Sequence, residues 1–193
     1  ATCAEVFETV RRLQAAQQTA IAGQILLAWL TAARVGCVLQ LQVRNVTLHQ
    51  VAAGVAPVDI QFCRGKGVKL RGPYTVHTAC PAEFLPLLQQ VSAGRPAQWL
   101  WAAESPMHRS VMGRAVLSAL RATSQELSQG SLRRGALQCM AASGVPDDTL
   151  ILYSGHTNVG MLRHYLDDGR VGLARAEMTR KAASYLHGGV TSA

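Results

Sequence analysis

The stretch SLRRGALQCMAASGVPDDTLILYSGHTNVGMLRHY, residues 131–165, does most to decide the fold. Its first part predicts a helix over 131–142, and Gly144 suits the left-handed position that commonly follows the end of a helix. The acidic pair that begins at Asp147 favours the start of a second helix over 146–153, because carboxylates interact favourably with the positive end of a helix dipole. We therefore expect two helices joined by a tight turn.

Outward from this stretch the chain remains mainly helical. The stripe of Val6, Val10 and Leu13 predicts one helix within residues 3–33, and a second helix over 20–33, capped by Thr19, is apolar on nearly every face, as buried central helices are. Further helices are expected near Leu39 and Leu41, from Pro81 through Leu88, over 110–128 and over 173–185.

Between residues 44 and 80 the apolar pattern changes to a period of two, which indicates strands. The alternating positions are Val46 and Leu48, then Val58, Ile60 and Phe62, then Val68 and Leu70, then Tyr74, Val76 and Cys80. Arg64-Gly65-Lys66-Gly67 reads as a turn with Lys66 at the tip of a hairpin. The predicted fold class is α+β: mainly helical, with a small three-stranded antiparallel sheet.

Composition narrows the functional classes. The chain has 193 residues and a formal net charge of +8, and 16 of its 19 basic residues are Arg. Arginine can donate two parallel hydrogen bonds to phosphate or carboxylate, so this bias favours an anionic polymer as partner, although a genome rich in G and C gives the same bias.

The longest nearly unbroken apolar run, residues 25–33, is about half the length that a bilayer span needs. Five widely spaced cysteines without C-x-x-C argue against a disulfide scaffold or zinc site and favour a reducing compartment.

The chemistry-bearing side chains of the opening stretch stand in a regular order. His156 lies 23 residues after Arg133 and closes the run ILYSGH, and Tyr165 lies nine residues after His156. This order resembles the H-x-x-R, L-x-x-x-G-H and tyrosine pattern of the tyrosine recombinases, the phage-integrase and Xer-like family of DNA breaking and rejoining enzymes. The runs Arg133-Arg134-Gly135 and Gly169-Arg170 are similar to the DIRS-like retroelement subgroup of that family.

Two upstream segments extend the resemblance to about residues 20–186. Thr31-Ala32-Ala33-Arg34 resembles the family's T-G-x-R-x-x-E segment, with Ala32 in place of the glycine and Cys37 in place of the glutamate. Gly65-Lys66-Gly67-Val68-Lys69 resembles its G-K-G-x-K hairpin. The resemblance therefore implies five catalytic residues, which are Arg34, Lys66, Arg133, His156 and Tyr165.

The residue types suit phosphodiester chemistry without a metal or another cofactor. Arg34 and Arg133 can each donate two parallel hydrogen bonds to the non-bridging oxygens of a phosphate. Nearby cations favour the phenolate of Tyr165, which would attack phosphorus and form a covalent phosphotyrosyl bond. Lys66 would protonate the leaving oxygen as general acid, and His156 would donate a hydrogen bond to the phosphate.

One departure from the pattern weakens the expected activity. The histidine of H-x-x-R falls at position 130, where this chain has glycine, and loss of a general base costs about 10²-fold or more. His164, next to Tyr165, is an alternative source of that group, although adjacent helical residues point in different directions. A second hypothesis follows: a recombinase-derived DNA-binding module with impaired chemistry.

Each residue alone also fits an ordinary structural role. Arg34 and His156 suit helix ends, Lys66 a turn, and Tyr165 a packed position, while Tyr153 is a competing nucleophile whose neighbours Leu150 to Leu152 indicate packing. Trp99 and Trp101 are interpreted as core or loop anchors. A type IB topoisomerase and a helical protein with no nucleic-acid role are the remaining alternatives.

The resemblance also implies partners and a setting. It predicts one catalytic domain over 1–193 that acts on double-stranded DNA, with a separate N-terminal DNA-clamping domain outside this chain. Residues 171–187 would dock on a neighbouring protomer, and no membrane or small-molecule partner is expected. The setting would be intracellular, in a nucleus or a bacterial nucleoid, and the role would be integration or excision of a mobile element.

Overall fold

The computed structural model describes residues 1–65, 68–69, 72–101, 106–156, 159–163 and 166. Their contacts group into two compact units, Ala1–Ala136 and Leu137–Ala193. Helix α7 (Gln129–Ala142) begins in the first unit and ends in the second. The predicted mixture of helices with one small antiparallel sheet is confirmed.

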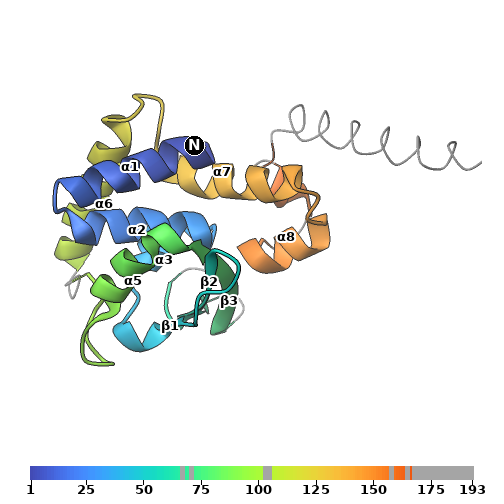
Figure 1. The fold of residues 1–193 in the computed structure, drawn as a ribbon. Coiled ribbons are helices and arrows are strands. Elements are labelled where there is room, and N and C mark those ends of the chain that lie inside the picture. Colours follow the sequence, from blue (N-terminus) through green and yellow to red (C-terminus); the bar gives the residue numbers. More distant parts are fainter. Residues whose placement is uncertain (66–67, 70–71, 102–105, 157–158, 164–165, 167–193) are drawn as a thin grey trace, which may run out of the picture. The chain divides into compact units, whose positions relative to one another are not determined.

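Helices α1 (Cys3–Ala15), α2 (Thr19–Leu30) and α6 (Pro106–Arg121) form the helical part of the first unit (Figure 1). Thr2 caps α1 in a capping box with Glu5. Every residue of α2 from Ala22 to Trp29 is buried, and α2 contacts both α1 and α6, which confirms the predicted central helix. Thr19 is the first residue of α2 rather than its cap. Helix α6 begins and ends earlier than predicted, because the chain turns at Thr123, whose hydroxyl bonds that of Thr9 on α1.

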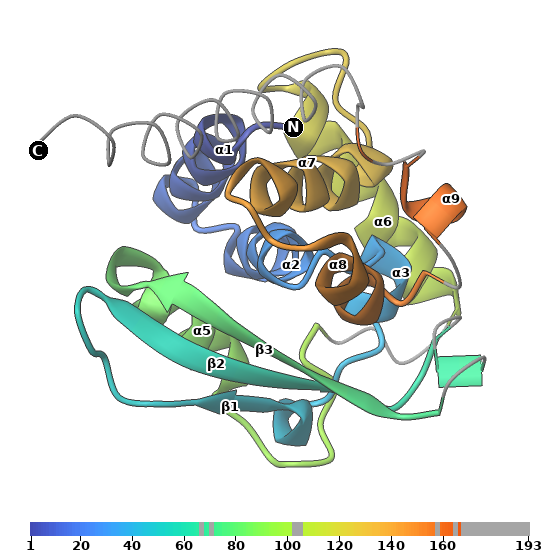
Figure 2. The same cartoon turned by 90° about the vertical axis from the view of Figure 1, so that its right-hand side faces the viewer.

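The sheet consists of β1 (Val46–Leu48), β2 (Val55–Phe62) and β3 (Tyr74–Pro81) in the antiparallel order β1-β2-β3. Figure 2 shows the three strands side by side, with α2 above them. Alternate residues of the two long strands face the core, as the period-two pattern predicted. These buried residues are Ala56, Val58, Ile60, Phe62, Val76 and Cys80.

The loop that joins β2 to β3 differs from the predicted strand at Val68 and Leu70. The described pairing of β2 with β3 ends at Phe62 and Tyr74. Val68 and Lys69 are helical, since Lys69 N donates to Gly65 O and Gly72 N donates to Val68 O. Leu70 lies outside the described residues. The apolar alternation there was too short to distinguish a strand from a helical turn.

Three short helices connect these parts: α3 (Val35–Val38), η1 (Val43–Asn45) and η2 (Ala82–Phe84). Helix α3 ends before Leu39, earlier than predicted. Pro81 caps η2, and α5 (Leu85–Ser92) follows it, close to the predicted start. Trp101 is buried and donates from Nε1 to Val38 O at 2.8 Å, which confirms that it anchors the core.

In the second unit, α8 (Asp147–Ser154) and α9 (Val159–Arg163) follow α7. Gly144 has φ +88°, as expected for the residue after a helix end, and the acidic pair lies in the first turn of α8. The predicted helix over 173–185 lies outside the described residues. Within the described part of the chain, every helix is too short or too polar to traverse a lipid bilayer.

Candidate active site

Arg34 stands at a sharp turn between α2 and α3. Thr31 ends α2: its hydroxyl donates to Leu27 O at 2.6 Å and accepts from Ala33 N at 3.3 Å. Ala32 then adopts φ +48°, a left-handed conformation that favours glycine. The family pattern has glycine at this position, and the turn explains that preference. Arg34 follows as the extended N-cap of α3, with a partly exposed side chain.

Arg133 is buried in α7 and reaches the same turn. Its side chain is 4% exposed, and Nη1 donates to Ala32 O at 2.7 Å. Because Ala32 lies two residues before Arg34, this hydrogen bond brings the two predicted arginines to one turn. The neighbouring Arg134 is exposed, so only one of the adjacent pair faces the interior.

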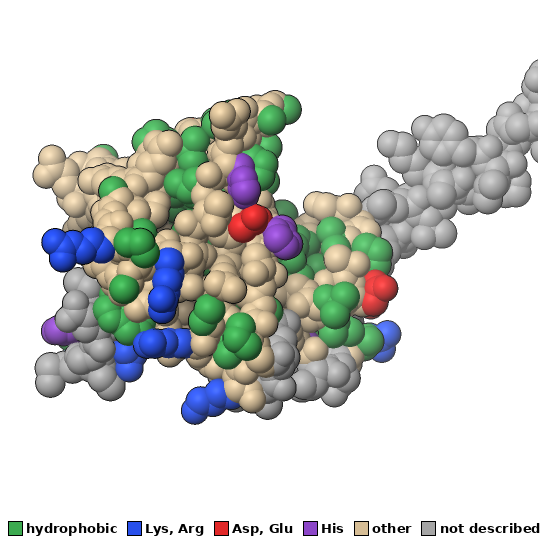
Figure 3. All heavy atoms as spheres, turned by 90° about the horizontal axis from the view of Figure 1, so that it is seen from below, with side chains coloured by type: hydrophobic (Ala, Val, Ile, Leu, Met, Phe, Trp, Pro, Cys, Tyr) green, Lys and Arg blue, Asp and Glu red, His purple; other side chains and the backbone are tan. Residues whose placement is uncertain are grey.

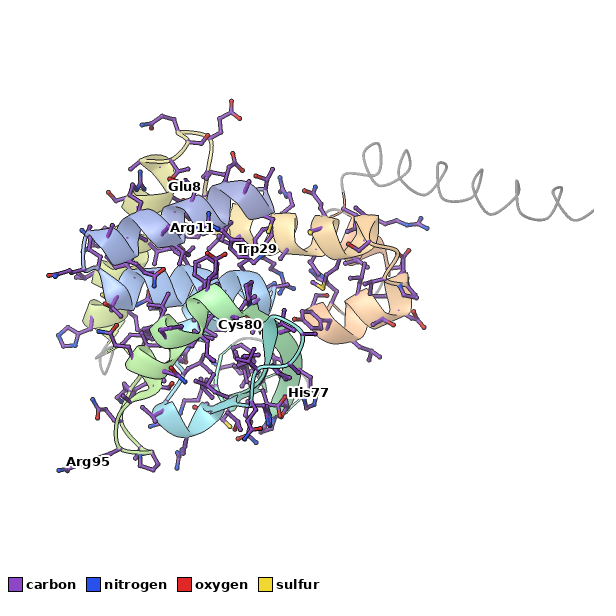
Figure 4. All side chains as sticks on the ribbon, in the orientation of Figure 1. Glu8, Arg11, Trp29, His77, Cys80 and Arg95 are labelled. Carbon is purple, nitrogen blue, oxygen red and sulfur yellow. The ribbon has the colours of Figure 1, made fainter. Side chains whose placement is uncertain are left out.

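Glycine at position 135 allows α7 to approach α2 closely. A Cβ at Gly135 would lie 3.0 Å from Cζ3 of Trp29 and would overlap the carbonyl of Ala1. Trp29, which is labelled in Figure 4, belongs to α2. The close approach places Arg133, two residues earlier, against the end of α2.

Gly130 occupies the first turn of α7, one helical turn before Arg133. Residues three apart share a helix face, so the spacing of H-x-x-R places both side chains on one side. Gly130 is exposed, and among the described residues an added Cβ would meet only Ser128 Oγ, at 3.6 Å. The position therefore has room for a side chain and supplies none.

Lys66 and Tyr165 both lie outside the described residues, so the structure places their neighbours only. Residues 62–65, here called the stem, lead from β2 to Lys66. Gly65 has φ +106°, and a Cβ there would lie 3.0 Å from Cys37 Sγ. The cysteine that replaces the pattern's glutamate thus packs against the residue before Lys66.

The stem also carries a contact that the sequence did not indicate. The Arg64 guanidinium lies over the Trp99 ring, 5.0 Å from its centroid, which is a cation–π geometry. Trp99 was interpreted as an anchor, and a tryptophan far along the chain gives no signal of this pairing.

Exposed arginines lie in the stem and in two other segments of the first unit. Arg44 and Arg95 lie on adjacent segments, since Arg44 N donates to Pro96 O at 3.0 Å, and Arg64 is also exposed. Figure 3, which shows the molecule from below, has most of its basic side chains on one half of the visible face. Figure 4 shows Arg95 pointing outward. Such a surface suits an anionic polymer.

His156 lies in the second unit, directly after the left-handed Gly155 that ends α8. It is 6% exposed, and its Nδ1 lies 2.7 Å from Ser154 Oγ, a hydrogen bond that fixes the ring. The competing Tyr153 is half-buried. Leu152, expected to pack, is 74% exposed because it faces away from the buried Leu150.

Comparison with known proteins gives one matching family model and a similar solved structure. A family model described as Phage integrase family matches residues 4–170. Comparison with curated proteins gives no match. Among solved structures, the chain is similar to the XerH site-specific recombinase bound to difH substrate in a pre-cleavage complex. The TM-score is 0.59 at 14% identity, and the match covers 91% of this chain and 53% of that one, so the chain spans about half the length of that recombinase.

Proposed function

The chain belongs to the phage integrase family, and we propose that it is a tyrosine recombinase catalytic domain that breaks and rejoins double-stranded DNA. The observation that carries this proposal is the hydrogen bond from Arg133 to Ala32 O, which brings Arg34 and Arg133 to one turn. In the proposal, the guanidiniums of both residues bind the non-bridging oxygens of one phosphate, where the transition state gathers negative charge.

The reaction needs a nucleophile and a proton donor. The Tyr165 phenolate attacks phosphorus and forms a phosphotyrosyl bond, while the bond from phosphorus to the DNA leaving oxygen breaks. Lys66 transfers a proton to that oxygen, which leaves as a hydroxyl. Rejoining runs these steps in reverse, so the bond energy is conserved in the intermediate.

His156 orients the phosphate in this proposal. Nδ1 of the ring shares a hydrogen bond with Ser154 Oγ at 2.7 Å. This contact orients the ring, and in the proposal His156 donates a hydrogen bond to a phosphate oxygen. Its burial strengthens such a hydrogen bond, because water competes less for it.

Duplex DNA is the proposed partner, bound in part by the exposed Arg44 and Arg95. Phosphate contacts by these side chains make affinity fall steeply with salt. We propose further that protomers assemble on DNA through residues 171–187 and that the reaction serves integration or excision of a mobile element.

A covalent-trapping experiment tests the activity. A pool of nicked duplexes, randomised across the scissile region, is incubated with the protein, and DNA that stays attached in SDS is recovered and sequenced. Wild type should form this adduct and Tyr165→Phe should not. Tyr153→Phe is the matched control and should keep the adduct. An adduct that persists in Tyr165→Phe, or none from wild type, contradicts the proposal.

Gly130 supports a second candidate function, a DNA-binding module with impaired chemistry. The glycine removes the side chain of H-x-x-R, but the open space around it accommodates one. If the remaining site is intact, Gly130→His should raise the rate of adduct formation about 10²-fold. Duplex binding without adduct from both proteins supports the binding module instead.

A further inference from the structure

The stem is held on one side by an aromatic ring. Arg64 and Gly65 are the residues immediately before Lys66, and the Arg64 guanidinium lies 5.0 Å from the centroid of the Trp99 ring. Arg64 is exposed and Trp99 is partly exposed, so this contact lies at the surface of the first unit.

Trp99 is itself fixed to the segment that follows α3. It forms a β-bridge with Gln42, whose Nε2 donates to Ala97 O at 2.9 Å. Val43 N donates to Gln98 O at 2.9 Å, and Leu100 N donates to Leu41 O at 3.1 Å. The backbone on both sides of Trp99 is therefore hydrogen-bonded to residues 41–43, which makes the ring a fixed support.

Besides the hydrogen bond from Asn45 Nδ2 to Cys63 Sγ at 3.7 Å, a further contact on the stem comes from α3. Gly65 has no Cβ, and Cys37 Sγ lies 3.0 Å from the position that a Cβ would occupy. Cys37 is buried and lies three residues after Arg34. The stem is thus connected to the turn that carries the first arginine.

We propose that Trp99 is a positioning residue for Lys66. By stacking against Arg64, with Cys37 seated against Gly65, it fixes the stem and so the point from which the lysine reaches the leaving oxygen. This inference rests on the proposed function of Lys66 as general acid. Misplacement of a catalytic group by about 1 Å can lower a rate about 10²-fold.

A change of leaving group isolates this role. In a duplex whose scissile leaving oxygen is replaced by sulfur, the P–S bond breaks and sulfur departs as a thiolate without protonation, because the pKa of its conjugate thiol is about 8.5. Such a duplex, built on a sequence recovered by covalent trapping, needs no general acid but still needs the nucleophile and the arginines that bind the phosphate. Lys66→Ala serves as the reference variant: it should form adduct slowly on the oxygen duplex and at close to the wild-type rate on the sulfur duplex.

Trp99→Ala should lower the rate of adduct formation roughly 10-fold to 100-fold on the oxygen duplex and leave it close to wild type on the sulfur duplex. Trp99→Phe keeps a ring face and should remain near wild type on both. Arg64→Gln, which removes the cation from the ring, should show the same dependence on leaving group as Trp99→Ala. Trp101→Phe, a change in the core, should not alter the ratio of the two rates.

Equal loss on both duplexes for Trp99→Ala and Arg64→Gln, or no loss on oxygen, would overturn the positioning role. Absence of adduct from wild type on both duplexes would overturn the proposed activity, and the inference with it. A Lys66→Ala protein that stays slow on sulfur would overturn the general-acid assignment.

Discussion

Arg133 and the stem show two different ways of holding side chains that we propose to be catalytic. Arg133 is buried in a long helix, and its guanidinium is fixed by the carbonyl of Ala32. The end of the stem at Arg64 and Gly65 is at least partly exposed and is held by side-chain contacts with Trp99 and Cys37. Groups held by the core share their contacts with the fold, whereas groups held at the surface depend on a few local contacts.

The difference has a consequence for mutagenesis. Loss of a core-held arginine should change activity and stability together, because the same hydrogen bond serves both. Loss of a surface contact should change the rate with little effect on unfolding, since exposed interactions contribute little to stability.

The largest expected effect tests the core-held side of this comparison. Arg133→Ala should lower the rate of adduct formation about 10³-fold, since one phosphate donor group is lost. It should also lower the free energy of unfolding in urea by about 1–3 kcal/mol, because Ala32 O loses its donor. The exposed Arg134→Ala is the control and should stay within about 0.5 kcal/mol of wild type. A fully active or fully stable Arg133→Ala protein contradicts the assignment.

The arginines show how far sequence reasoning reaches. Resemblance to the family's motifs selected Arg34 and Arg133, and the structure brings both residues to one turn. The bond that does so joins a side chain to a backbone carbonyl 101 residues away, which no local pattern encodes. The glycine preference at position 32 became intelligible only with the positive φ of Ala32.

The helices and strands were likewise predictable only where the sequence carries a long local pattern. Long periodic segments such as α2 were predicted well, because burial on every face leaves a strong pattern. The apolar pair Val68 and Leu70 was interpreted as a strand because two positions cannot separate the periods. The stacking of Arg64 on Trp99 could not be predicted, since it depends on how two loops meet.

Substitution at Gly65 tests the contact between the stem and Cys37. Gly65→Ala should lower the free energy of unfolding by about 2 kcal/mol, because an L side chain is strained at φ +106° and its Cβ meets Cys37 Sγ at 3.0 Å. Gly36→Ala is the matched control: nothing lies within 4 Å of its Cβ, so stability should rise by about 0.5–1 kcal/mol. In a Cys37→Ala background the Gly65→Ala loss should shrink. An equal loss in both backgrounds contradicts the contact with Cys37.

A smaller effect is expected at Ala32, where the core-held region is strained. Ala32→Gly should relieve the left-handed conformation at φ +48° and raise the free energy of unfolding by about 0.5 kcal/mol, because the relief exceeds the added entropy of the unfolded chain. Ala33→Gly, the neighbouring control, gains no such relief and should destabilise. Equal losses from both substitutions in urea denaturation would show that the turn at Ala32 is not strained.

The smallest effect is expected on the outer face of the sheet, where contacts are exposed and electrostatic. Asp59 lies between His77 Nδ1 at 2.7 Å and His49 Nε2 at 2.9 Å, and these hydrogen bonds hold the pKa of its carboxyl below the usual value. Because the folded pKa lies below the unfolded one, the carboxylate stabilises the fold above the unfolded pKa, and this contribution is lost as pH falls through the folded pKa. Asp59→Asn should therefore lower Tm at neutral pH by less than ~2 °C, and the difference from wild type should vanish in strong acid. Glu126→Gln controls for the change in net charge. A difference that grows with acid would mean that the histidines do not stabilise the carboxylate.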